Sequence, residues 1–235
     1  MGKRIIVTGG TKGIGRAIIL KFAEMGYDIA TCARNSSDLV LLKNEILKKY
    51  PYQEFIANTC DVTNPKEITL WSDEVKNKWH TCDILINNAG TFLPGSVITE
   101  DEKSLPLQIE TNLYSAYRFT RLLIPLLKQN GSGHVFNMCS IASMAAYPGG
   151  GAYTISKFAL YGFTKCLRED LKKTNIKVTA VLPGAVWTES WQGSGFTPDD
   201  MIKPEDIAHL IWECSQLSKQ AVVEDLIIRP QGGDL

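Results

Sequence analysis

Tyr153 and Lys157 stand four residues apart, and Ser140 precedes Tyr153 by 13 residues. Positions i and i+4 lie on one face of a helix, so the Lys157 ammonium could approach the Tyr153 phenol. A nearby cation favours the phenolate and lowers a pKa that starts at about 10, which would make Tyr153 a proton donor or acceptor near neutral pH. Ser140 ends an apolar run and could donate to a substrate oxygen. Taken singly, the three are more often a half-buried tyrosine, a solvated lysine and a strand-end serine, so their surroundings must decide.

Residues 4–25, RIIVTGGTKGIGRAIILKFAEM, form a second chemical pattern. They predict a buried strand at 4–8, a turn containing Gly9, Gly13 and Gly15, and an amphipathic helix. At such a turn, free backbone N–H groups and the positive end of the helix dipole face whatever sits above, and the missing side chains let a pyrophosphate come close. The spacing differs from the general G-x-G-x-x-G fingerprint, and one glycine loop is weak evidence by itself. It predicts a dinucleotide site that the rest of the chain has to support.

The residues after the second predicted strand indicate which dinucleotide is bound. A cofactor with a free ribose 2′-hydroxyl usually meets an acidic side chain about 20 residues after the glycines, whereas a 2′-phosphate needs a cation. Here that position holds Ala33, Arg34 follows it, and Lys12 adds a positive charge from the glycine turn. The guanidinium could bind phosphate oxygens and stack on adenine. The alternative is two solvated surface cations, but the pair at these positions favours NADP(H).

Polar residues also follow the next two predicted strands. Asp61 could accept from the adenine amino group while Val62 covers the adenine face, although a turn or N-cap carboxylate is nearly as good an interpretation of Asp61. The run NNAG at 87–90 suits a tight strand end that ties neighbouring loops and lets a ribose approach. Asn112 lies near the middle of a long helical pattern, where asparagine has no propensity advantage, and on its own it indicates nothing.

Apolar, β-rich runs alternate with helical patterns along the whole chain. This alternation predicts an α/β fold with right-handed crossovers: a Rossmann-type, doubly wound parallel sheet of about seven strands with helices on both faces, in one domain spanning residues 1–235. We expect strands at 4–8, 28–32, 54–59, 83–86, 133–138, 176–181 and 225–229, and helices near 14–25, 36–49, 65–79, 105–129, 152–173 and 204–218. Ligands of such sheets bind beyond the carboxyl ends of the strands, which is where the motifs above fall.

Composition argues against several classes of partner. Lysine plus arginine equals aspartate plus glutamate, 25 against 25, so no overall field attracts the chain to nucleic acid or to an anionic membrane. The six cysteines show no CxxC pair and no metal-ligand spacing, which predicts no metal site and reduced thiols in a cytoplasmic protein. No segment approaches a membrane span, and the apolar run near the start is too short for a signal peptide.

Together, these motifs resemble the short-chain dehydrogenase/reductase family over essentially the whole chain, in the compact NADP-dependent branch that holds oxoacyl-acyl-carrier-protein reductases and carbonyl reductases. The motifs that fall in family order are the glycine turn, Asp61, the 87–90 run, Asn112, Ser140, Tyr153, Lys157 and Pro183-Gly184. The resemblance implies that Tyr153 protonates a carbonyl oxygen while NADPH delivers hydride to the carbon. It also implies that Lys157 holds the nicotinamide ribose and depresses the Tyr153 pKa, that Ser140 polarises the carbonyl, and that Asn112 positions a water that passes protons to Lys157.

The resemblance also implies which residues bind the cofactor. The segment Pro183-Gly184, with Val186 and Thr188, would fix the nicotinamide carboxamide. The expected set is Gly9, Thr11, Lys12, Gly13, Ile14, Gly15, Arg34, Asn35, Asp61, Val62, Asn88, Ala89, Gly90, Tyr153, Lys157, Pro183, Gly184, Val186 and Thr188.

The substrate side is expected to be apolar, lined by Phe92, Leu93, Ile141, Met144, Tyr147, Trp187 and Trp191. With no obvious cation for a carboxylate or phosphate, this set favours a lipophilic or small neutral ketone or aldehyde. For the two tryptophans, packing of a loop is at least as good an interpretation. The helix predicted at 152–173 has two apolar faces, and the resemblance implies that it forms a subunit contact in a homodimer or homotetramer.

Three functions stay open at this point. The leading one is NADPH-dependent reduction of a carbonyl to an alcohol. The second is NADP-dependent oxidation of an alcohol, or reduction of an imine or pterin, by the same fold. The third is a non-catalytic NADP-binding sensor; the intact Ser140, Tyr153 and Lys157 argue against it, because such a protein has no physical reason to keep a proton-transfer set.

Overall fold

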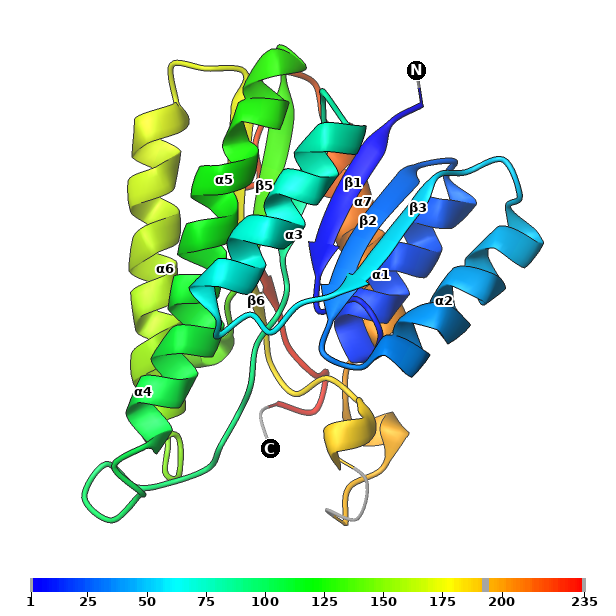
Figure 1. Cartoon of the computed structure of the whole chain (residues 1–235). Helices are drawn as coiled ribbons and strands as arrows, with labels where there is room; N and C mark the ends of the chain where they lie inside the picture. Colours follow the sequence, from blue (N-terminus) through cyan, green and yellow to red (C-terminus); the bar gives the residue numbers. More distant parts are fainter. Residues whose placement is uncertain (1, 192–194, 234–235) are drawn as a thin grey trace.

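The structure is a computed structural model that describes residues 2–191 and 195–233. Within these residues one parallel sheet is formed by seven strands: β1 (Arg4–Thr8), β2 (Asp28–Ala33), β3 (Phe55–Thr59), β4 (Ile84–Asn87), β5 (Gly133–Met138), β6 (Ile176–Pro183) and β7 (Asp225–Ile228). Their spatial order is β3-β2-β1-β4-β5-β6-β7, so the chain winds outward in both directions from the boundary between β1 and β4 (Figure 1). The predicted doubly wound sheet is therefore confirmed.

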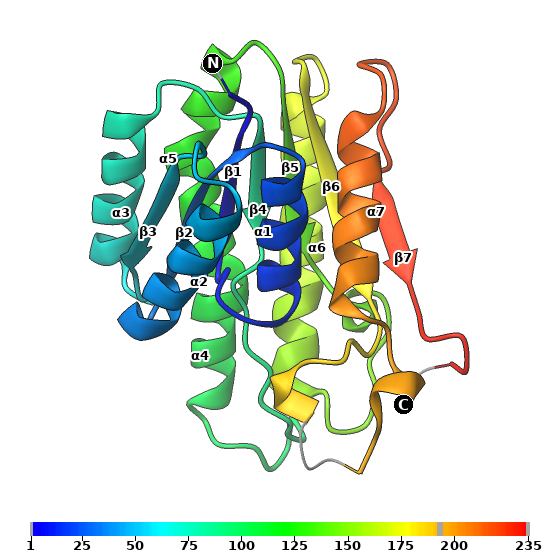
Figure 2. The same ribbon diagram turned by 90° about the vertical axis from the view of Figure 1, so that its right-hand side faces the viewer.

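Helices cover both faces of this sheet (Figures 1 and 2). One face carries α1 (Gly13–Glu24), α2 (Ser36–Lys49) and α7 (Pro204–Gln216), and the other carries α3 (Pro65–Lys78), α5 (Ser115–Gln129) and α6 (Gly151–Leu171). Short 3-10 turns lie at Ile141–Ser143, Glu189–Trp191 and Pro198–Asp200. None of the helices in the described part of the chain combines the length and hydropathy that crossing a bilayer requires.

Strand β1 shows why the strands could be located from the sequence. Ile5, Ile6 and Val7 are each fully buried. Ile5 and Val7 belong to the apolar cluster under α1, α2 and α7, and Ile6 belongs to the cluster under α3 and α5. Because a parallel sheet covered on both faces buries both sets of alternating side chains, each strand is a continuous apolar run in the sequence. The predicted strand ends lie within about two residues of the observed ones.

One predicted helix is wrong in its interior. The segment expected to be a single helix over 105–129 consists of α4 (Ser104–Ile109), a π-helical turn (Glu110–Tyr114) and α5. A π turn takes one residue more than an α turn and is typical of functional sites. Asn112, at the centre of this turn, is buried. It is therefore not an asparagine that faces solvent, although its position in a helical pattern would permit that.

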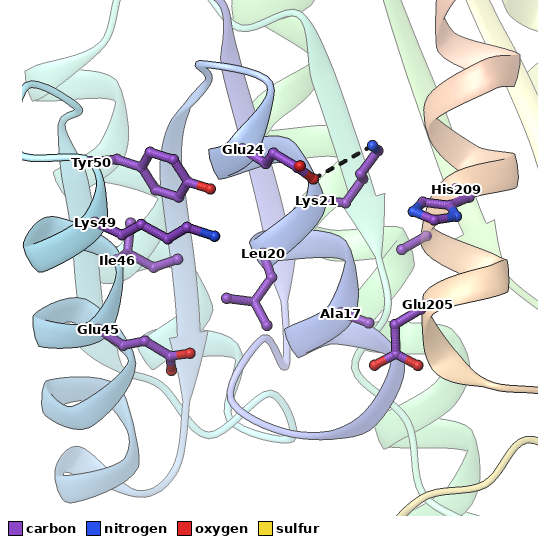
Figure 3. Close-up of a pocket in the computed structure, with 11 residues that line it drawn as sticks. Ala17, Leu20, Lys21, Glu24, Glu45, Ile46, Lys49, Tyr50, Glu205 and His209 are labelled. Atoms are coloured by element: carbon purple, nitrogen blue, oxygen red, sulfur yellow. Dashed lines mark ion pairs between the residues drawn. The ribbon is translucent and has the colours of Figure 1, made fainter.

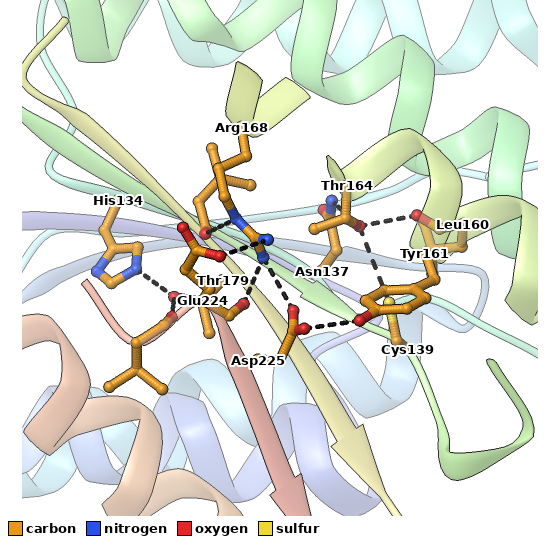
Figure 4. Close-up of polar contacts among 12 residues, drawn as sticks. His134, Asn137, Cys139, Leu160, Tyr161, Thr164, Arg168, Thr179, Glu224 and Asp225 are labelled. Carbon is orange, nitrogen blue, oxygen red and sulfur yellow. Dashed lines mark hydrogen bonds and ion pairs between the residues drawn. The ribbon is translucent and has the colours of Figure 1, made fainter. Parts of the chain in front are cut away.

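The edge strand β7 is fastened to the molecule by side chains of α6 (Figure 4). Arg168 donates to the Asp225 carboxylate at 3.0 Å and to the Val178 carbonyl at 3.2 Å, and the Tyr161 hydroxyl donates to Asp225 at 2.6 Å. In turn, the Ile228 carbonyl of β7 accepts from the Gly184 N–H at 2.8 Å. These contacts therefore also hold the segment that follows β6, where part of the predicted site lies.

His134 of β5 is a buried titratable group outside that site (Figure 4). Its ring stacks on Phe136 at 3.9 Å, and its Nε2 lies 2.8 Å from Thr179 Oγ1. Thr179 gives its own proton to the Val223 carbonyl, so Nε2 of His134 is the donor in their contact. Burial, helped by the positive charge of Lys177, lowers the pKa of His134 to about 3.

This burial predicts acid sensitivity. The unfolded His134 takes up a proton near its ordinary pKa of 6.5 and the folded residue does so only near 3, so the stability it contributes is lost as pH falls through that window. We expect the unfolding free energy of His134→Gln, from urea titration, to fall by about 2 kcal/mol less than that of the wild type between pH 6.5 and 4.5. The exposed His80, changed to Gln, is the matched control. Equal losses in the wild type and His134→Gln would contradict the prediction.

Candidate active site

A cavity of about 900 Å³ opens beyond the carboxyl ends of β1 to β4. In Figure 1 these strand ends point downward. Predicted residues that line it are Gly9, Thr11, Lys12, Gly13, Ile14, Gly15, Arg34, Asn35, Asp61, Val62, Asn88, Ala89, Gly90 and Thr188. It is also lined by residues that the sequence did not single out: Cys32, Asp38, Cys60, Thr63, Thr91, Leu107, Thr111 and Glu189. The sequence could have indicated four of these lining residues, Cys32, Cys60, Thr63 and Thr91, only because they lie beside predicted site residues at the ends of strands.

The glycine turn packs directly on the end of β4. Gly9 and Gly13 adopt φ values of 68° and 51°, which L side chains rarely adopt. The Asn88 side-chain amide donates to the Thr8 carbonyl at 2.9 Å and to the Gly9 carbonyl at 3.0 Å. A Cβ on Gly15 would overlap both this amide and the Gly9 carbonyl. The 87–90 run thus ties neighbouring loops, as its sequence predicts.

This close approach makes Gly15 intolerant of a side chain. We expect Gly15→Ala to lower the unfolding free energy by about 1–3 kcal/mol, because the turn must move to admit the methyl group. Gly162 of α6 is the matched control: a Cβ there would meet nothing within 4 Å, so Gly162→Ala should raise stability by about 0.5–1 kcal/mol through helix propensity. Urea unfolding of both variants checks the opposite signs, and a stabilised Gly15→Ala would contradict the packing.

The first turn of α1 is open to an anion. Lys12, its N-cap residue, forms no side-chain cap hydrogen bond, whereas Asn35 caps α2 by accepting from the Ser37 and Asp38 N–H groups. The first-turn residues Gly13 and Gly15 line the cavity. Uncapped N–H groups and the positive end of the helix dipole favour a phosphate or diphosphate here.

The two cations expected to clamp a 2′-phosphate differ in their surroundings. Arg34 is exposed and lines the cavity, and among the described residues no carboxylate pairs with it. Lys12 lies 3.1 Å from Glu189 and 3.8 Å from Asp38, and these carboxylates, Glu189 foremost, raise the Lys12 pKa. Lys12 therefore already has two carboxylate partners and is not left unpaired for a bound anion. The sequence around Lys12 does not indicate these partners.

Asp61 stabilises a turn, which is one of the two roles that its sequence position predicts. One of its carboxylate oxygens accepts from the Thr63 N–H at 2.9 Å and from the Thr63 hydroxyl at 2.8 Å. Asn64, and not Asp61, caps α3. Asp61 and Val62 both line the cavity. Since the turn uses only one carboxylate oxygen of Asp61, the other is available to a ligand.

The three proton-transfer candidates come together, as predicted from their spacing. Tyr153 and Lys157 lie in the first two turns of α6, and Ser140 follows β5. The Lys157 ammonium donates to the Met138 carbonyl at 2.7 Å and lies 5.6 Å from the centre of the Tyr153 ring. The Ser140 hydroxyl lies close enough to the Tyr153 phenol to lower its pKa. None of the three lines the cavity itself, but a Cβ on its lining residue Gly90 would lie 3.6 Å from the Lys157 nitrogen, so Lys157 lies next to it.

The expected lowering of the Tyr153 pKa is wrong in this structure. Burial raises the pKa of Tyr153, and the neighbouring Cys139 raises it further, while the hydrogen bond from Ser140 lowers it. Lys157 does not overcome this, because its ammonium points at a backbone carbonyl; its own burial lowers its pKa to about 8, against a smaller opposing effect of Cys139. At neutral pH, Tyr153 is therefore a protonated phenol beside a charged lysine.

Asn112 joins the loop after β4 to α6. Its side-chain oxygen accepts from the Thr91 N–H at 2.7 Å, and its nitrogen donates to the Thr91 carbonyl at 3.0 Å and to the Ser156 hydroxyl at 2.8 Å. Ser156 in turn donates to the Tyr153 carbonyl. These long-range bonds, which sequence reasoning missed, account for the π-helical turn, because an unbroken α-helix would aim this side chain elsewhere.

The segment after β6 crosses from Ser140 to the glycine turn. The Ser140 hydroxyl lies 3.5 Å from the Pro183 carbonyl, Gly184 is held by β7, and Val186 forms a bridge with Ile202. Thr188 lies over Gly13, where a Cβ would come 3.0 Å from its methyl group. The predicted nicotinamide segment thus lies next to Ser140 at one end and next to the glycine turn at the other.

Of the predicted substrate-side residues, Phe92 has the clearest contact. Its ring meets the Tyr153 ring edge-on at 4.9 Å, and it is 47% exposed. Met144 and Tyr147 are also exposed; partial burial, with a smaller effect of the neighbouring Tyr153, raises the pKa of Tyr147 to about 12. Trp191 meets Phe196 at 5.8 Å, which supports loop packing for this tryptophan. Ile141 begins the 3-10 turn after Ser140, and the Leu93 carbonyl accepts a hydrogen bond from Gln108. The Trp187 N–H donates to the Ile202 carbonyl. Residues 192–194, which follow Trp191, lie outside the described residues.

A second hollow, of about 300 Å³, lies between α1, α2 and α7 and contains none of the predicted site residues (Figure 3). Charges of both signs line it: Lys21 pairs with Glu24 at 3.6 Å, and Glu45 pairs with Arg16 outside the hollow. In residues 2–191 and 195–233, no three His, Cys, Asp or Glu side chains are placed to hold a metal.

Comparison with known proteins adds independent information. Residues 3–197 match the family model described as short chain dehydrogenase. The chain is 30% identical over 242 residues to a sepiapterin reductase of Chlorobaculum tepidum, with 98% of this chain and 97% of the relative covered. An alcohol dehydrogenase from the archaeon Thermococcus sibiricus, complexed with 5-hydroxy-NADP, superposes with a TM-score of 0.89 at 25% identity over 97% of both chains. L-sorbose reductase from Gluconobacter frateurii, complexed with NADPH and L-sorbose, superposes at 0.88 and 25% identity over 100% of this chain and 97% of that one.

Proposed function

The chain belongs to the short-chain dehydrogenase/reductase family of oxidoreductases, and on this basis we propose that it reduces a lipophilic ketone or aldehyde to an alcohol with NADPH. One observation carries the proposal. Ser140, Tyr153 and Lys157 lie together, and Lys157 lies next to Gly90, which lines the cavity into which the uncapped turn of α1 opens. A proton donor thus lies beside a site suited to a phosphorylated cofactor.

The size of the cavity, its backbone geometry and the position of Arg34 support binding of NADP(H). At about 900 Å³ it is large enough for a dinucleotide, and the glycine turn presents backbone N–H groups where a diphosphate would bind. Arg34, exposed and unpaired among the described residues, would bind the 2′-phosphate, and Lys157 would bind the nicotinamide ribose. The bound cofactor supplies hydride.

The chain's own residues would handle the proton. Tyr153, kept as a phenol by burial, donates to the carbonyl oxygen, and Ser140 donates a second hydrogen bond to the same oxygen. Charged Lys157 favours the phenolate left on Tyr153. Asn112 holds the loop after β4 against α6, which keeps this set in one arrangement.

The apolar rim supports the proposed substrate class. Phe92, Met144 and Tyr147 are each between 42% and 47% exposed; Phe92 contacts Tyr153, Tyr147 lies close enough to Tyr153 to affect its own pKa, and Met144 follows the 3-10 turn after Ser140. Apolar side chains near a proton donor favour a neutral, lipophilic carbonyl compound over a charged one.

A direct assay tests this function. The protein is mixed with NADPH and, separately, with acetophenone, benzil, cyclohexanone and decanal, and the loss of reduced nicotinamide absorbance is followed. Reduction of at least one carbonyl is expected. Turnover only of cyclohexanol with NADP⁺ would favour the alcohol-oxidising alternative, and cofactor binding with no turnover of any compound would favour a sensor.

A second candidate is reduction of a pterin. It is favoured by the relative named sepiapterin reductase, which is similar to this chain over nearly its whole length. Sepiapterin is therefore added to the same assay. A rate with sepiapterin that exceeds those of the four simple carbonyls would select this function.

The charge of Lys157 predicts the pH dependence. Burial lowers its pKa to about 8, so the ammonium is lost as pH rises through about 8 and no longer favours the phenolate left on Tyr153. We expect kcat/KM for carbonyl reduction to fall as pH rises from 7 to 9.5, by about tenfold for each pH unit above 8. Initial rates at fixed ionic strength check this. A flat profile to pH 9.5 would contradict the role of Lys157.

We also propose that the chain forms a homodimer through α5 and α6. Tyr117, Ile155 and Phe158 on these helices are 40–45% exposed and would be covered by a partner, which supports a contact through these helices. Sedimentation equilibrium should give twice the chain mass, and a monomer at micromolar concentration would contradict the proposal.

A further inference from the structure

Helix α6 carries Tyr153 and Lys157, but its own sequence does not cap it. Gly150 stands at the N-cap position and has no side chain to accept from the first-turn N–H groups. Tyr153 lies in that first turn, so any looseness at this helix end moves the phenol directly.

The missing cap comes from a residue far back in the chain. Both carboxylate oxygens of Glu100 accept from the Ala152 N–H, at 3.1 and 3.2 Å. Ala152 is fully buried, so solvent is not an alternative acceptor. A carboxylate at a helix N-terminus also interacts favourably with the helix dipole. Glu100 therefore performs for α6 the function that Asn35 and Asn64 perform for α2 and α3.

The carboxylate has little freedom in this position. A Cβ on Gly95 would come 2.7 Å from the Glu100 carboxylate, and a Cβ on Gly151 would come 2.6 Å from it. Gly95 also forms a bridge with Gly150 and donates to the Gly149 carbonyl at 2.9 Å. The loop after β4 and the turn before α6 thus lie side by side (Figure 1), with Glu100 between them.

The same loop reaches the reacting groups. It carries Phe92, whose ring meets the Tyr153 ring, and Thr91, whose backbone is held by Asn112. We propose that Glu100 is a positioning residue, which fixes the first turn of α6 against the loop after β4 and so sets the Tyr153 phenol relative to Lys157 and Phe92. The inference rests on the proposed function, because it assumes that Tyr153 is the proton donor.

The test compares Glu100→Ala with Glu100→Gln, which keeps an oxygen for the Ala152 N–H. Rates are measured with whichever of acetophenone, benzil, cyclohexanone and decanal the wild type reduces fastest, and kcat is expressed per NADPH-binding site titrated by nicotinamide fluorescence. We expect Glu100→Ala to lower kcat by about tenfold or more, as for a small misplacement of a reacting group, with the NADPH dissociation constant within about twofold of wild type. Glu100→Gln should stay within about threefold of wild type.

Glu102 is the matched control, because it is an acidic residue of the same loop that is exposed. Glu102→Ala should leave kcat unchanged. A merely structural role of Glu100 would reduce the number of binding sites and leave kcat per site intact. If Glu100→Ala does not fold, Glu100→Met replaces it, since its unbranched stem can still pack against Gly95 while no acceptor remains.

The outcomes separate the two proposals. Wild-type kcat in Glu100→Ala or Glu100→Met, or a loss in Glu100→Gln equal to that in Glu100→Ala, would overturn the positioning role. Tyr153→Phe is measured in parallel: if it keeps the wild-type rate, the proposed function itself fails, whatever the Glu100 variants show.

Discussion

Tyr153→Phe should lower kcat for carbonyl reduction by about a thousandfold, within the range that positioned acid–base groups contribute. The variant removes the only proton that this side chain can donate and keeps the ring, and hence its edge contact with Phe92 at 4.9 Å. Because the phenol is not needed to hold a dinucleotide in the glycine turn, the dissociation constant of NADPH, measured by nicotinamide fluorescence, should stay within about threefold of wild type.

Tyr147→Phe is the matched control for this loss. Tyr147 is a second phenol; burial, with a smaller effect of the neighbouring Tyr153, raises its pKa to about 12. It should keep kcat within a factor of about three, because it is not the proton donor. A Tyr153→Phe rate within tenfold of wild type would remove Tyr153 from the mechanism, and equal losses in both variants would mean that the two phenols cannot be assigned separate roles.

Ala33→Asp combined with Arg34→Gln should move the ratio of kcat/KM for NADPH over NADH towards NADH by about a hundredfold. Loss of a charge-assisted contact to phosphate is worth about 1.5–3 kcal/mol, and the new carboxylate would repel a 2′-phosphate and accept from a 2′-hydroxyl. Lys12 is poorly placed to compensate, since Glu189 at 3.1 Å and Asp38 at 3.8 Å already engage it.

Arg16→Gln controls for the general loss of a positive charge near the cavity. Arg16 lies on α1 and pairs with Glu45 through two hydrogen bonds, so its removal should leave the cofactor preference unchanged. Initial rates with both cofactors at several concentrations measure the ratio. If the double variant prefers NADPH as strongly as the wild type does, the phosphate clamp lies elsewhere.

Features dictated by local pattern were predictable from the sequence. The strands are continuous apolar runs because both faces of the sheet are buried, and the glycine turn follows from the backbone conformations of Gly9 and Gly13. The spacing of Tyr153 and Lys157 places them on one helix face whatever surrounds them. These local rules were enough to indicate the fold class and to bring the candidate residues together.

Features that depend on partners distant in the chain were not predictable. The π-helical turn follows from bonds between Asn112 and the residues Thr91 and Ser156, while its own sequence reads as ordinary helix. The direction of the Tyr153 pKa depends on burial by the whole fold, which spacing does not reveal. Glu100 lies 52 residues before the N–H group that it accepts from, and nothing in its neighbourhood marks it as a cap.

The most direct test of the central claim, that Tyr153 and the glycine turn act in one reductase site, follows the hydride itself. NADPH carrying deuterium at both C4 positions is incubated with acetophenone, benzil, cyclohexanone and decanal, and the products are analysed by mass spectrometry. The account predicts an alcohol with one deuterium on its carbinol carbon from the wild type, and almost none from Tyr153→Phe. An alcohol without deuterium, or equal labelled product from both proteins, would contradict it.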